Sequence, residues 1–209
     1  MSNFVLPRIY PITDARISGI PHQEQIEKLS LGEAALIQIR EKYLSAGDFY
    51  DAAKRGISVA RKHSVKIIIN DRVDIAMAIN ADGVHLGQDD LPPEYARQIL
   101  GADKIIGFST HSLEQAVKAL ELPIDYIALG PIFSTQTKKN ADPPLGLSGL
   151  AGIRKAIGDF PLVAIGGITA ENYGDVLKAG ANSAAMIGYL LSDTSKITQK
   201  IQQLMTHGI

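Results

Sequence analysis

The sequence predicts a single parallel (β/α)8 TIM barrel, and three observations support this prediction. Short apolar segments rich in β-branched residues recur eight times along the 209-residue chain, as expected for strands buried on both faces. Helix-like segments lie between them, and a spacing of roughly 20–25 residues is typical of parallel strands joined by right-handed crossovers. Eight such units favour closure into a barrel. An open, doubly wound sheet is the alternative, but the first strand lacks the Gly-x-Gly-x-x-Gly sequence of its dinucleotide-binding form.

The predicted strands and helices alternate along the chain. Apolar, β-branched residues predict strands over 9–13, 36–40, 66–69, 83–86, 104–108, 126–129, 162–165 and 184–187. Helical spacing of apolar residues predicts helices over 48–62, 112–120, 169–179 and 193–205, the third with Thr169 as its N-cap. Glycine near a helix end is typical of a left-handed C-cap, which we expect at Gly32, Gly83, Gly101 and Gly180.

Composition narrows the class of protein. The hydrophobic fraction is 45% and the formal net charge is −1, which is ordinary for a globular protein, and no linker interrupts the one domain expected over 1–209. The near-neutral charge argues against nucleic-acid binding. No segment of ~18 apolar residues predicts a membrane span, and no apolar N-terminal segment predicts a signal peptide, so the expected location is the cytoplasm. Without cysteine, disulfides and thiolate nucleophiles are excluded.

Polar residues follow the predicted strands, at the end of the barrel where catalysis is expected. At the end of the second strand, Gln38, Arg40 and Lys42 alternate with Ile39 and Glu41, so the two sets should point in opposite directions if the segment is extended. Two cations and an amide on one side suit a polyanionic ligand. The alternative is a solvated strand end with surface charges.

Carboxylates follow the third and fourth predicted strands. Asp71 and Asp90 therefore fall at neighbouring strand ends. One or two carboxylates, together with substrate phosphates, are the usual protein share of a Mg²⁺ site. The alternative is N-capping of the helices that begin near Val73 and at Pro92, and one residue can serve both purposes.

Two features suit phosphate groups. The loop 130–147 is long and carries hydroxyl, amide and lysine side chains, which is typical of a lid or binding loop; the alternative is a mobile surface loop. Gly166 and Gly167 join a buried strand to a helix start, where backbone N–H groups and the helix dipole attract an anion. The alternative is a tight turn that needs glycine for its own conformation.

The histidines are weaker signals. His85 lies inside an apolar segment and is expected to be a core histidine that donates to the backbone. His22 is expected on the surface. No spacing of histidine and glutamate indicates zinc.

These motifs together resemble the thiamin-phosphate synthase (thiamin-phosphate pyrophosphorylase) family. The resemblance extends through nearly the whole chain, and seven motifs in register make it specific, although each alone is weak to moderate. They are residues 10–14, 38–42, 69–74, 83–91, 107–112, 130–139 and 165–169.

The resemblance implies a reaction between two small-molecule substrates. The diphosphate of 4-amino-2-methyl-5-hydroxymethylpyrimidine diphosphate leaves, and the nitrogen of 4-methyl-5-(2-phosphoethyl)thiazole, or of its carboxylate form, attacks the methylene carbon. Thiamin phosphate and pyrophosphate result, by a dissociative substitution that one Mg²⁺ ion assists. Formation of a homo-oligomer is an open expectation, because the sequence does not show the oligomeric state.

The resemblance also implies roles for individual residues. Asp71 and Asp90 would hold Mg²⁺, and the catalytic roles would fall to Lys138, Arg40 and Ser109. The thiazole phosphate would contact Thr135, Gln136, Thr137, Gly167, Ile187 and Gly188. The pyrimidine diphosphate would contact Gln38, Ile39, Arg40, Glu41, Lys42, Asn70, Ser109 and Lys138, with Gln38 and Ser109 toward the pyrimidine.

Departures from the family pattern concern the thiazole-phosphate site. Gly188 stands where serine is frequent, Ser134 replaces a frequent proline, and Tyr189 is bulkier than the usual small residue. The alternative functions are a thiazole tautomerase-like protein and a non-catalytic thiamin-phosphate binder; an aldose–ketose or indole-pathway barrel is more distant. Because Asp71 and Asp90 are both present, the sequence favours the synthase.

Overall fold

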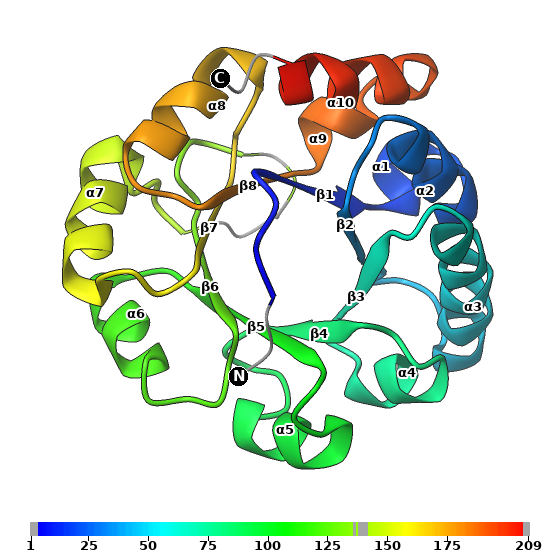
Figure 1. Ribbon diagram of the computed structural model, residues 1–209, viewed down its shortest axis with the longest axis horizontal. Helices are drawn as coiled ribbons and strands as arrows, with labels where there is room; N and C mark the ends of the chain where they lie inside the picture. The colour runs from blue at the N-terminus through cyan, green and yellow to red at the C-terminus, as the bar shows by residue number, and fades with distance from the viewer. Residues whose placement is uncertain (1–3, 136, 138–141, 207–209) are drawn as a thin grey trace.

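The computed structural model describes residues 4–135, 137 and 142–206, so the expectations for Gln136 and Lys138 lie outside the described residues. Within those ranges, eight parallel strands close into one barrel in chain order, which confirms the predicted fold. Figure 1 shows the strands at the centre and the helices around them. The strands are β1 (Ile9–Thr13), β2 (Leu36–Ile39), β3 (Lys66–Asn70), β4 (Gly83–Leu86), β5 (Ile105–Thr110), β6 (Tyr126–Leu129), β7 (Leu162–Ile165) and β8 (Ser183–Met186).

The helices follow the strands and cover the outside of the barrel (Figure 1). They are α1 (Ala15–Ser18), α2 (His22–Leu31), α3 (Ala46–Lys62), α4 (Val73–Ala78), α5 (Pro93–Leu100), α6 (Leu113–Ala119), α7 (Gly146–Ile157), α8 (Ala170–Lys178), α9 (Gly188–Leu191) and α10 (Ile197–Thr206), with the 3-10 turn η1 (Thr194–Lys196) before the last. The helix predicted over 193–205 is therefore divided between η1 and α10. Over the described part of the chain, no helix has the length and apolarity needed to cross a membrane.

Helices α2 and α7 were not predicted, and their composition explains why. Helix α2 is polar overall and begins after Pro21 without a side-chain cap, and α7 contains three glycines, which have low helix propensity. Tertiary packing outweighs these local preferences. In α7, for example, Leu150, Ile153 and Ile157 are buried against the barrel.

The core has two layers that meet at the barrel wall. The outer layer packs strands against helices, and Ile37 and Ile67 are examples of fully buried residues within it. The inner layer fills the barrel and consists of Tyr10, Ile12, Leu36, Ile68, Ile105, Tyr126, Ala128, Val163 and Ala185. Because both faces of each strand are covered, the strands are mostly apolar, and this is why they could be recognised in the sequence.

The glycines expected at helix ends have two different roles. Gly101 and Gly180 have positive φ values of 84° and 110°, as predicted. Gly32 does not, because its φ is −88°, and the next residue, Glu33, takes the left-handed conformation instead. Gly83 lies in β4 and is needed for space, because a Cβ there would lie 2.0 Å from the carbonyl oxygen of Ile105.

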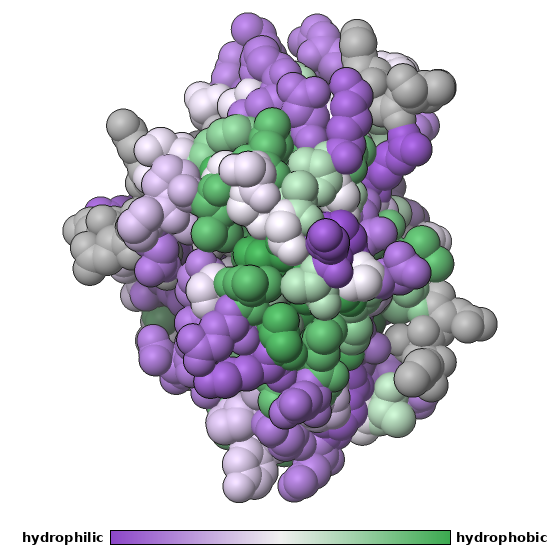
Figure 2. Space-filling model, turned by 90° about the vertical axis from the view of Figure 1, so that its left-hand side faces the viewer, coloured by the Kyte–Doolittle hydropathy of each residue, from purple (hydrophilic) through white to green (hydrophobic). Residues whose placement is uncertain are grey.

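One side of the barrel has an apolar surface patch. Figure 2 shows it on the side that carries α6 and α7. Helix α6 exposes Leu113, Val117 and Leu120 there. Exposed apolar patches are frequent at association surfaces, and formation of a homo-oligomer stays a prediction.

Substituting Gly83 by Ala should destabilise the barrel, since the added methyl group would overlap backbone of β5. We expect the free energy of unfolding to fall by about 3 kcal/mol, the upper part of the range for overpacking. Gly152→Ala is the matched control, because a Cβ there meets no atom and the position lies on the exposed side of α7. It should raise stability by about 0.5–1 kcal/mol. Urea unfolding measures both, and equal effects would contradict the packing argument.

Candidate active site

A cavity of about 700 Å³ opens at the carboxyl ends of the barrel strands. Its volume is typical of small-molecule sites. Ile39 is fully buried in the core, and neither Ile39 nor Glu41 lines the cavity. This agrees with the alternation of the segment, but not with the contacts to the pyrimidine diphosphate that the resemblance implies for these two residues. The predicted site residues that do line it are Gln38, Arg40, Lys42, Asn70, Asp71, Asp90, Ser109, Thr135, Thr137, Gly167, Ile187 and Gly188.

Asp71 and Asp90 form the acidic side of the cavity. Asp71 has a φ of 62°, which is uncommon for a residue with a side chain, and its N–H donates to the carbonyl oxygen of His85 at 2.8 Å. Asp90 Oδ2 accepts a 2.6 Å hydrogen bond from the N–H of Gly87. Burial raises the pKa of Asp90, and the nearby Asp71 carboxylate raises it further. Two carboxylates this close favour a bound cation.

Capping does not explain these two carboxylates. The N-cap of α4 is Arg72 and the N-cap of α5 is Pro92, and neither helix has a side-chain cap. Of the two interpretations that the sequence left open, capping is therefore wrong for both residues. Backbone strain like that at Asp71 is often found at functional sites.

The cations of the cavity already have carboxylate partners. Arg40 forms an ion pair with Asp14, whose other oxygen accepts from the N–H groups of Arg16 and Ile17 at the start of α1. Lys42 forms an ion pair with Asp71. The described lining contains two cations, Arg40 and Lys42, against four carboxylates, Asp71, Asp89, Asp90 and Asp142. Among the described lining residues, carboxylates therefore outnumber cations, and a bound cation would offset this excess.

Asn70 offers an unused hydrogen-bond donor. Its residue is 6% exposed, and its Nδ2 is buried without a hydrogen-bond partner among the described atoms. An unpaired buried donor costs about 1–3 kcal/mol. Because Asn70 also lines the cavity, a rotation of its amide would bring this donor to a ligand oxygen.

The Gly166–Gly167 turn lies against the loop that follows β6. Both glycines have positive φ, 105° and 63°, and a Cβ on Gly167 would lie 2.5 Å from the carbonyl oxygen of Ser134. Glycine is thus required by the turn itself, and the anion-binding interpretation stays open beside it. Thr169 caps α8 as predicted, with Asn172 completing a capping box. The N-terminus of α8 therefore follows the turn directly.

At Thr137, the β6–α7 loop lies beside the start of α9. Thr137 Oγ1 lies 3.6 Å from the position that a Cβ on Gly188 would take, and the Thr137 N–H donates to Thr135 Oγ1 at 3.3 Å. The residues predicted for a monophosphate thus converge from three segments that are distant in sequence: the β6–α7 loop, the β7–α8 turn and the β8–α9 junction.

Polar side chains inside the barrel contact one another, and Tyr10, His85 and Ser109 among them also line the cavity. The sequence predicted His85 as a core histidine bonded to the backbone; it is buried, but its ring nitrogens contact side chains, Tyr126 Oη at 3.0 Å and Ser109 Oγ at 2.8 Å. Burial lowers the pKa of His85 to about 4. Tyr10 and Tyr126 were read only as apolar strand residues, so their part in these contacts was missed.

His22 is not on the surface, contrary to the prediction. It is 2% exposed and contacts Thr13 Oγ1 at 2.8 Å and Glu41 Oε2 at 3.3 Å. Glu41 Oε1 also accepts from the N–H groups of Lys42 and Tyr43, each at 2.8 Å. Glu41 therefore turns away from the cavity and fixes the backbone that carries Lys42.

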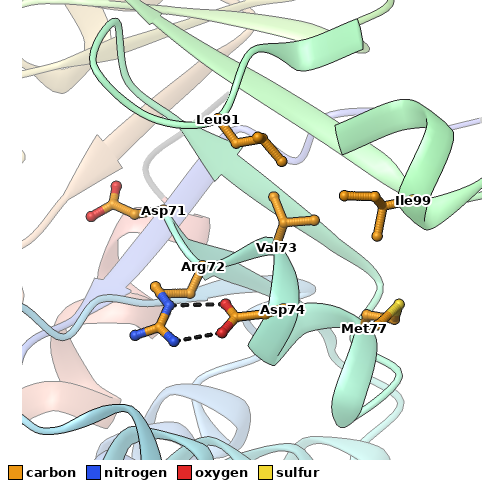
Figure 3. A pocket seen from close by; sticks show the side chains of 7 residues that line it. All are labelled: Asp71, Arg72, Val73, Asp74, Met77, Leu91 and Ile99. Carbon is orange, nitrogen blue, oxygen red and sulfur yellow. Dashed lines mark hydrogen bonds and ion pairs between the residues drawn. The ribbon is translucent and has the colours of Figure 1, made fainter. Parts of the chain in front are cut away.

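A second, outer groove of about 400 Å³ borders Asp71 on the side of α4 and α5. Figure 3 shows Asp71 pointing away from the apolar side chains of Val73, Leu91 and Ile99. Arg72 and Asp74 form a two-pronged ion pair there, at 2.9 and 2.5 Å (Figure 3). The carboxylate of Asp71 is thus directed away from this groove.

The family model described as thiamine monophosphate synthase matches residues 9–190. The chain belongs to the thiamin-phosphate synthase family. It is 46% identical to the thiamine-phosphate synthase of Clostridium novyi over 89% of this chain and 91% of that one, and 41% identical to that of Chloroflexus aurantiacus over 94% and 90%. The solved thiamine phosphate pyrophosphorylase of Pyrococcus furiosus is 34% identical, with a TM-score of 0.85 over 95% of this chain and 94% of that chain. The family resemblance predicted from the motifs is confirmed.

The unpaired amide of Asn70 and the hydroxyl of Thr137 should contribute to the binding of different anions. Asn70→Ala should weaken binding of pyrophosphate with Mg²⁺ about 10- to 100-fold, since hydrogen bonds to charged groups contribute about 1.5–3 kcal/mol. Thr137→Ala is the matched control and should leave pyrophosphate affinity within about twofold. Calorimetry measures both, and the reverse pattern would contradict the division of the cavity into two anion sites.

Proposed function

We propose that the chain joins 4-amino-2-methyl-5-hydroxymethylpyrimidine diphosphate to 4-methyl-5-(2-phosphoethyl)thiazole, or its carboxylate form, and releases thiamin phosphate and pyrophosphate. Family membership supports this reaction. The observation that carries the proposal is that one cavity has two different halves. One half contains acidic and basic side chains, and the other contains the Gly-Gly turn and threonine hydroxyl groups. A transferase with two phosphorylated substrates needs both halves.

The diphosphate would bind at the half formed by Arg40, Lys42 and Asn70, with Lys138 joining from beyond the described residues. Asp71 and Asp90 would hold one Mg²⁺ ion, and the excess of carboxylates over cations supports this assignment. The bound ion would offset the charge on the leaving diphosphate. Mg²⁺ usually takes one or two protein carboxylates, and its remaining ligands are water and substrate phosphate.

The thiazole phosphate would bind at the other half. Thr135 and Thr137 supply hydroxyl groups, and Gln136 lies between them, outside the described residues. Gly167, Ile187 and Gly188 would supply backbone N–H groups from the turn and from the start of α9. The two phosphorylated substrates then face each other across the cavity.

The proposed reaction needs no covalent bond between the protein and a substrate. The C–O bond to the diphosphate breaks with its electron pair on the leaving group, and the thiazole nitrogen supplies the pair for the new C–N bond. Positioning and charge neutralisation lower the barrier. Arg40, Lys42 and Lys138 would stabilise the leaving group, while Gln38 and Ser109 would orient the pyrimidine as its positive charge develops.

The alternatives lack support from the site. A tautomerase-like protein or a thiamin-phosphate binder needs no binding site for a diphosphate. In this cavity, the lining includes four charged residues that suit one: Asp71, Asp90, Arg40 and Lys42. The proposed reaction accounts for these four charges.

The reaction itself is the first test. Purified protein with both substrates and Mg²⁺ should form thiamin phosphate, and a chelator should stop it. Asp71→Asn and Asp90→Asn should each lower the rate roughly 10²–10³-fold, the usual cost of losing one electrostatic contact to a transition state. Asp74→Asn is the control, because Asp74 pairs with Arg72 in the outer groove. No product under saturating conditions would refute the proposal, and unchanged Mg²⁺ dependence in both site variants would refute the metal assignment.

Gly188→Ser tests the thiazole-phosphate half. A Cβ at this position makes only ordinary contact with Thr137, so the fold should tolerate serine. One added hydrogen bond contributes about 0.5–1.5 kcal/mol, so KM for the thiazole phosphate should fall about 2- to 10-fold with KM for the pyrimidine diphosphate unchanged. Steady-state kinetics with each substrate varied in turn measures this. A change confined to the pyrimidine diphosphate would place Gly188 in the other half.

A further inference from the structure

Five side chains form a continuous hydrogen-bonded chain across the inside of the barrel. Gln38 Nε2 donates to Tyr10 Oη at 3.2 Å, and Tyr10 Oη contacts Tyr126 Oη at 3.0 Å. Tyr126 Oη contacts His85 Nδ1 at 3.0 Å, and His85 Nε2 contacts Ser109 Oγ at 2.8 Å. The chain connects β2, β1, β6, β4 and β5, which lie around the barrel in Figure 1. Its two ends, Gln38 and Ser109, line the cavity, as do Tyr10 and His85.

The barrel makes room for this chain at Gly107 of β5. A Cβ there would lie 2.0 Å from Tyr126 Cζ, 2.3 Å from Tyr126 Oη and 2.5 Å from His85 Nδ1. The His85 and Tyr126 rings stack, with centroids 5.5 Å apart and planes 17° from parallel. The three middle members are 7% exposed or less, so their hydrogen bonds lie in a largely buried environment.

The protons of this chain all run in one direction if each of them is to have an acceptor within it. Each tyrosine hydroxyl has two partners in the chain and one proton, so that proton is satisfied there only when the hydroxyl donates to one partner and accepts from the other. A neutral imidazole likewise donates from one nitrogen and accepts at the other. Because Gln38 donates to Tyr10, it follows that Tyr10 donates to Tyr126, Tyr126 donates to His85 Nδ1, and His85 Nε2–H donates to Ser109.

We propose that Tyr10, Tyr126 and His85 are positioning residues that determine how both ends of the hydrogen-bonded chain meet the pyrimidine. Gln38 Oε1 is then presented to the pyrimidine as an acceptor, and the Ser109 hydroxyl as a donor. The direction of the internal protons leaves these two groups free for the cavity. The proposal rests on the proposed function for its substrate, a 4-aminopyrimidine.

The pattern is complementary to an aminopyrimidine and not to its oxo counterpart. A 4-aminopyrimidine presents an N–H donor beside a ring nitrogen that accepts, whereas a 4-oxopyrimidine presents a carbonyl acceptor beside a ring N–H donor. Positive charge that develops as the diphosphate leaves is shared by the amino group, so an acceptor at Gln38 binds it more strongly in the transition state. A site with fixed donors and acceptors discriminates strongly against a mismatched analogue.

The first test is the tautomer of His85, measured by ¹⁵N NMR on the ligand-free protein. The proposal requires a proton on Nε2 and none on Nδ1. The opposite tautomer would overturn it, because the chain would then run from Ser109 to Gln38. This measurement needs no turnover, so it decides the direction of the chain even if the protein forms no thiamin phosphate.

The second test uses the 4-amino and 4-oxo pyrimidine diphosphates with Tyr126→Phe. Removing the hydroxyl cuts the chain, so the Gln38 and Ser109 ends can reverse independently. The ratio of kcat/KM for amino over oxo substrate should fall at least tenfold. Tyr173→Phe is the matched control, since it removes the hydroxyl of another buried tyrosine, in α8, outside the chain, and it should keep the wild-type ratio.

The outcomes separate the proposal from a structural role. If Tyr126 only supports the fold, both substrates lose the same factor and the ratio stays unchanged, which would overturn the proposal. If wild-type protein forms product from neither substrate, the proposed function fails. The ratio of the dissociation constants of the two pyrimidine diphosphates then replaces the ratio of kcat/KM in this test. If Tyr126→Phe does not fold, the tautomer in the wild-type protein decides alone.

Discussion

Closure of the barrel is the constraint on which the rest of the structure depends. The pairing of β1 with β8, where Ile9 lies opposite Ala184 and Pro11 opposite Met186, brings the last strand beside the first. Only then do the start of α9, the turn after β7 and the residues after β2 border one cavity. Parallel direction matters equally, since it places the carboxyl ends of all strands at the same rim.

At that rim, oppositely charged side chains lie close together. Asp71 holds a left-handed backbone conformation, and its carboxylate lies between the Lys42 ammonium and the Asp90 carboxylate. The surrounding contacts keep this arrangement in place: Glu41 fixes the backbone of Lys42, and Gly87 donates to Asp90. Outside this cluster, polar side chains such as Gln38 and Ser109 share the cavity lining with apolar residues of the barrel core.

Much of this could be predicted from the sequence because the informative residues follow strands. Asp71, Asp90, Arg40 and Lys42 come directly after or close behind apolar segments, so fold class alone placed them at one rim. Contacts between distant residues could not be predicted in this way. Tyr10 and Tyr126 are 116 positions apart, and nothing in their local pattern distinguishes a hydrogen-bonded tyrosine from a packed one. His22 was misplaced for the same reason, since its burial depends on Glu41 and Thr13.

The ion pair between Lys42 and Asp71 has a consequence for how ligands would assemble in the proposed reaction. Metal binding at Asp71 would take the carboxylate from Lys42 and leave the ammonium free for a phosphate oxygen. Diphosphate binding at Lys42 would, in turn, free Asp71 for the metal. Each ligand then raises the affinity for the other by the same factor, because thermodynamic coupling is reciprocal. An ion pair that looks like a structural contact in the empty cavity would thus make the two ligands bind cooperatively.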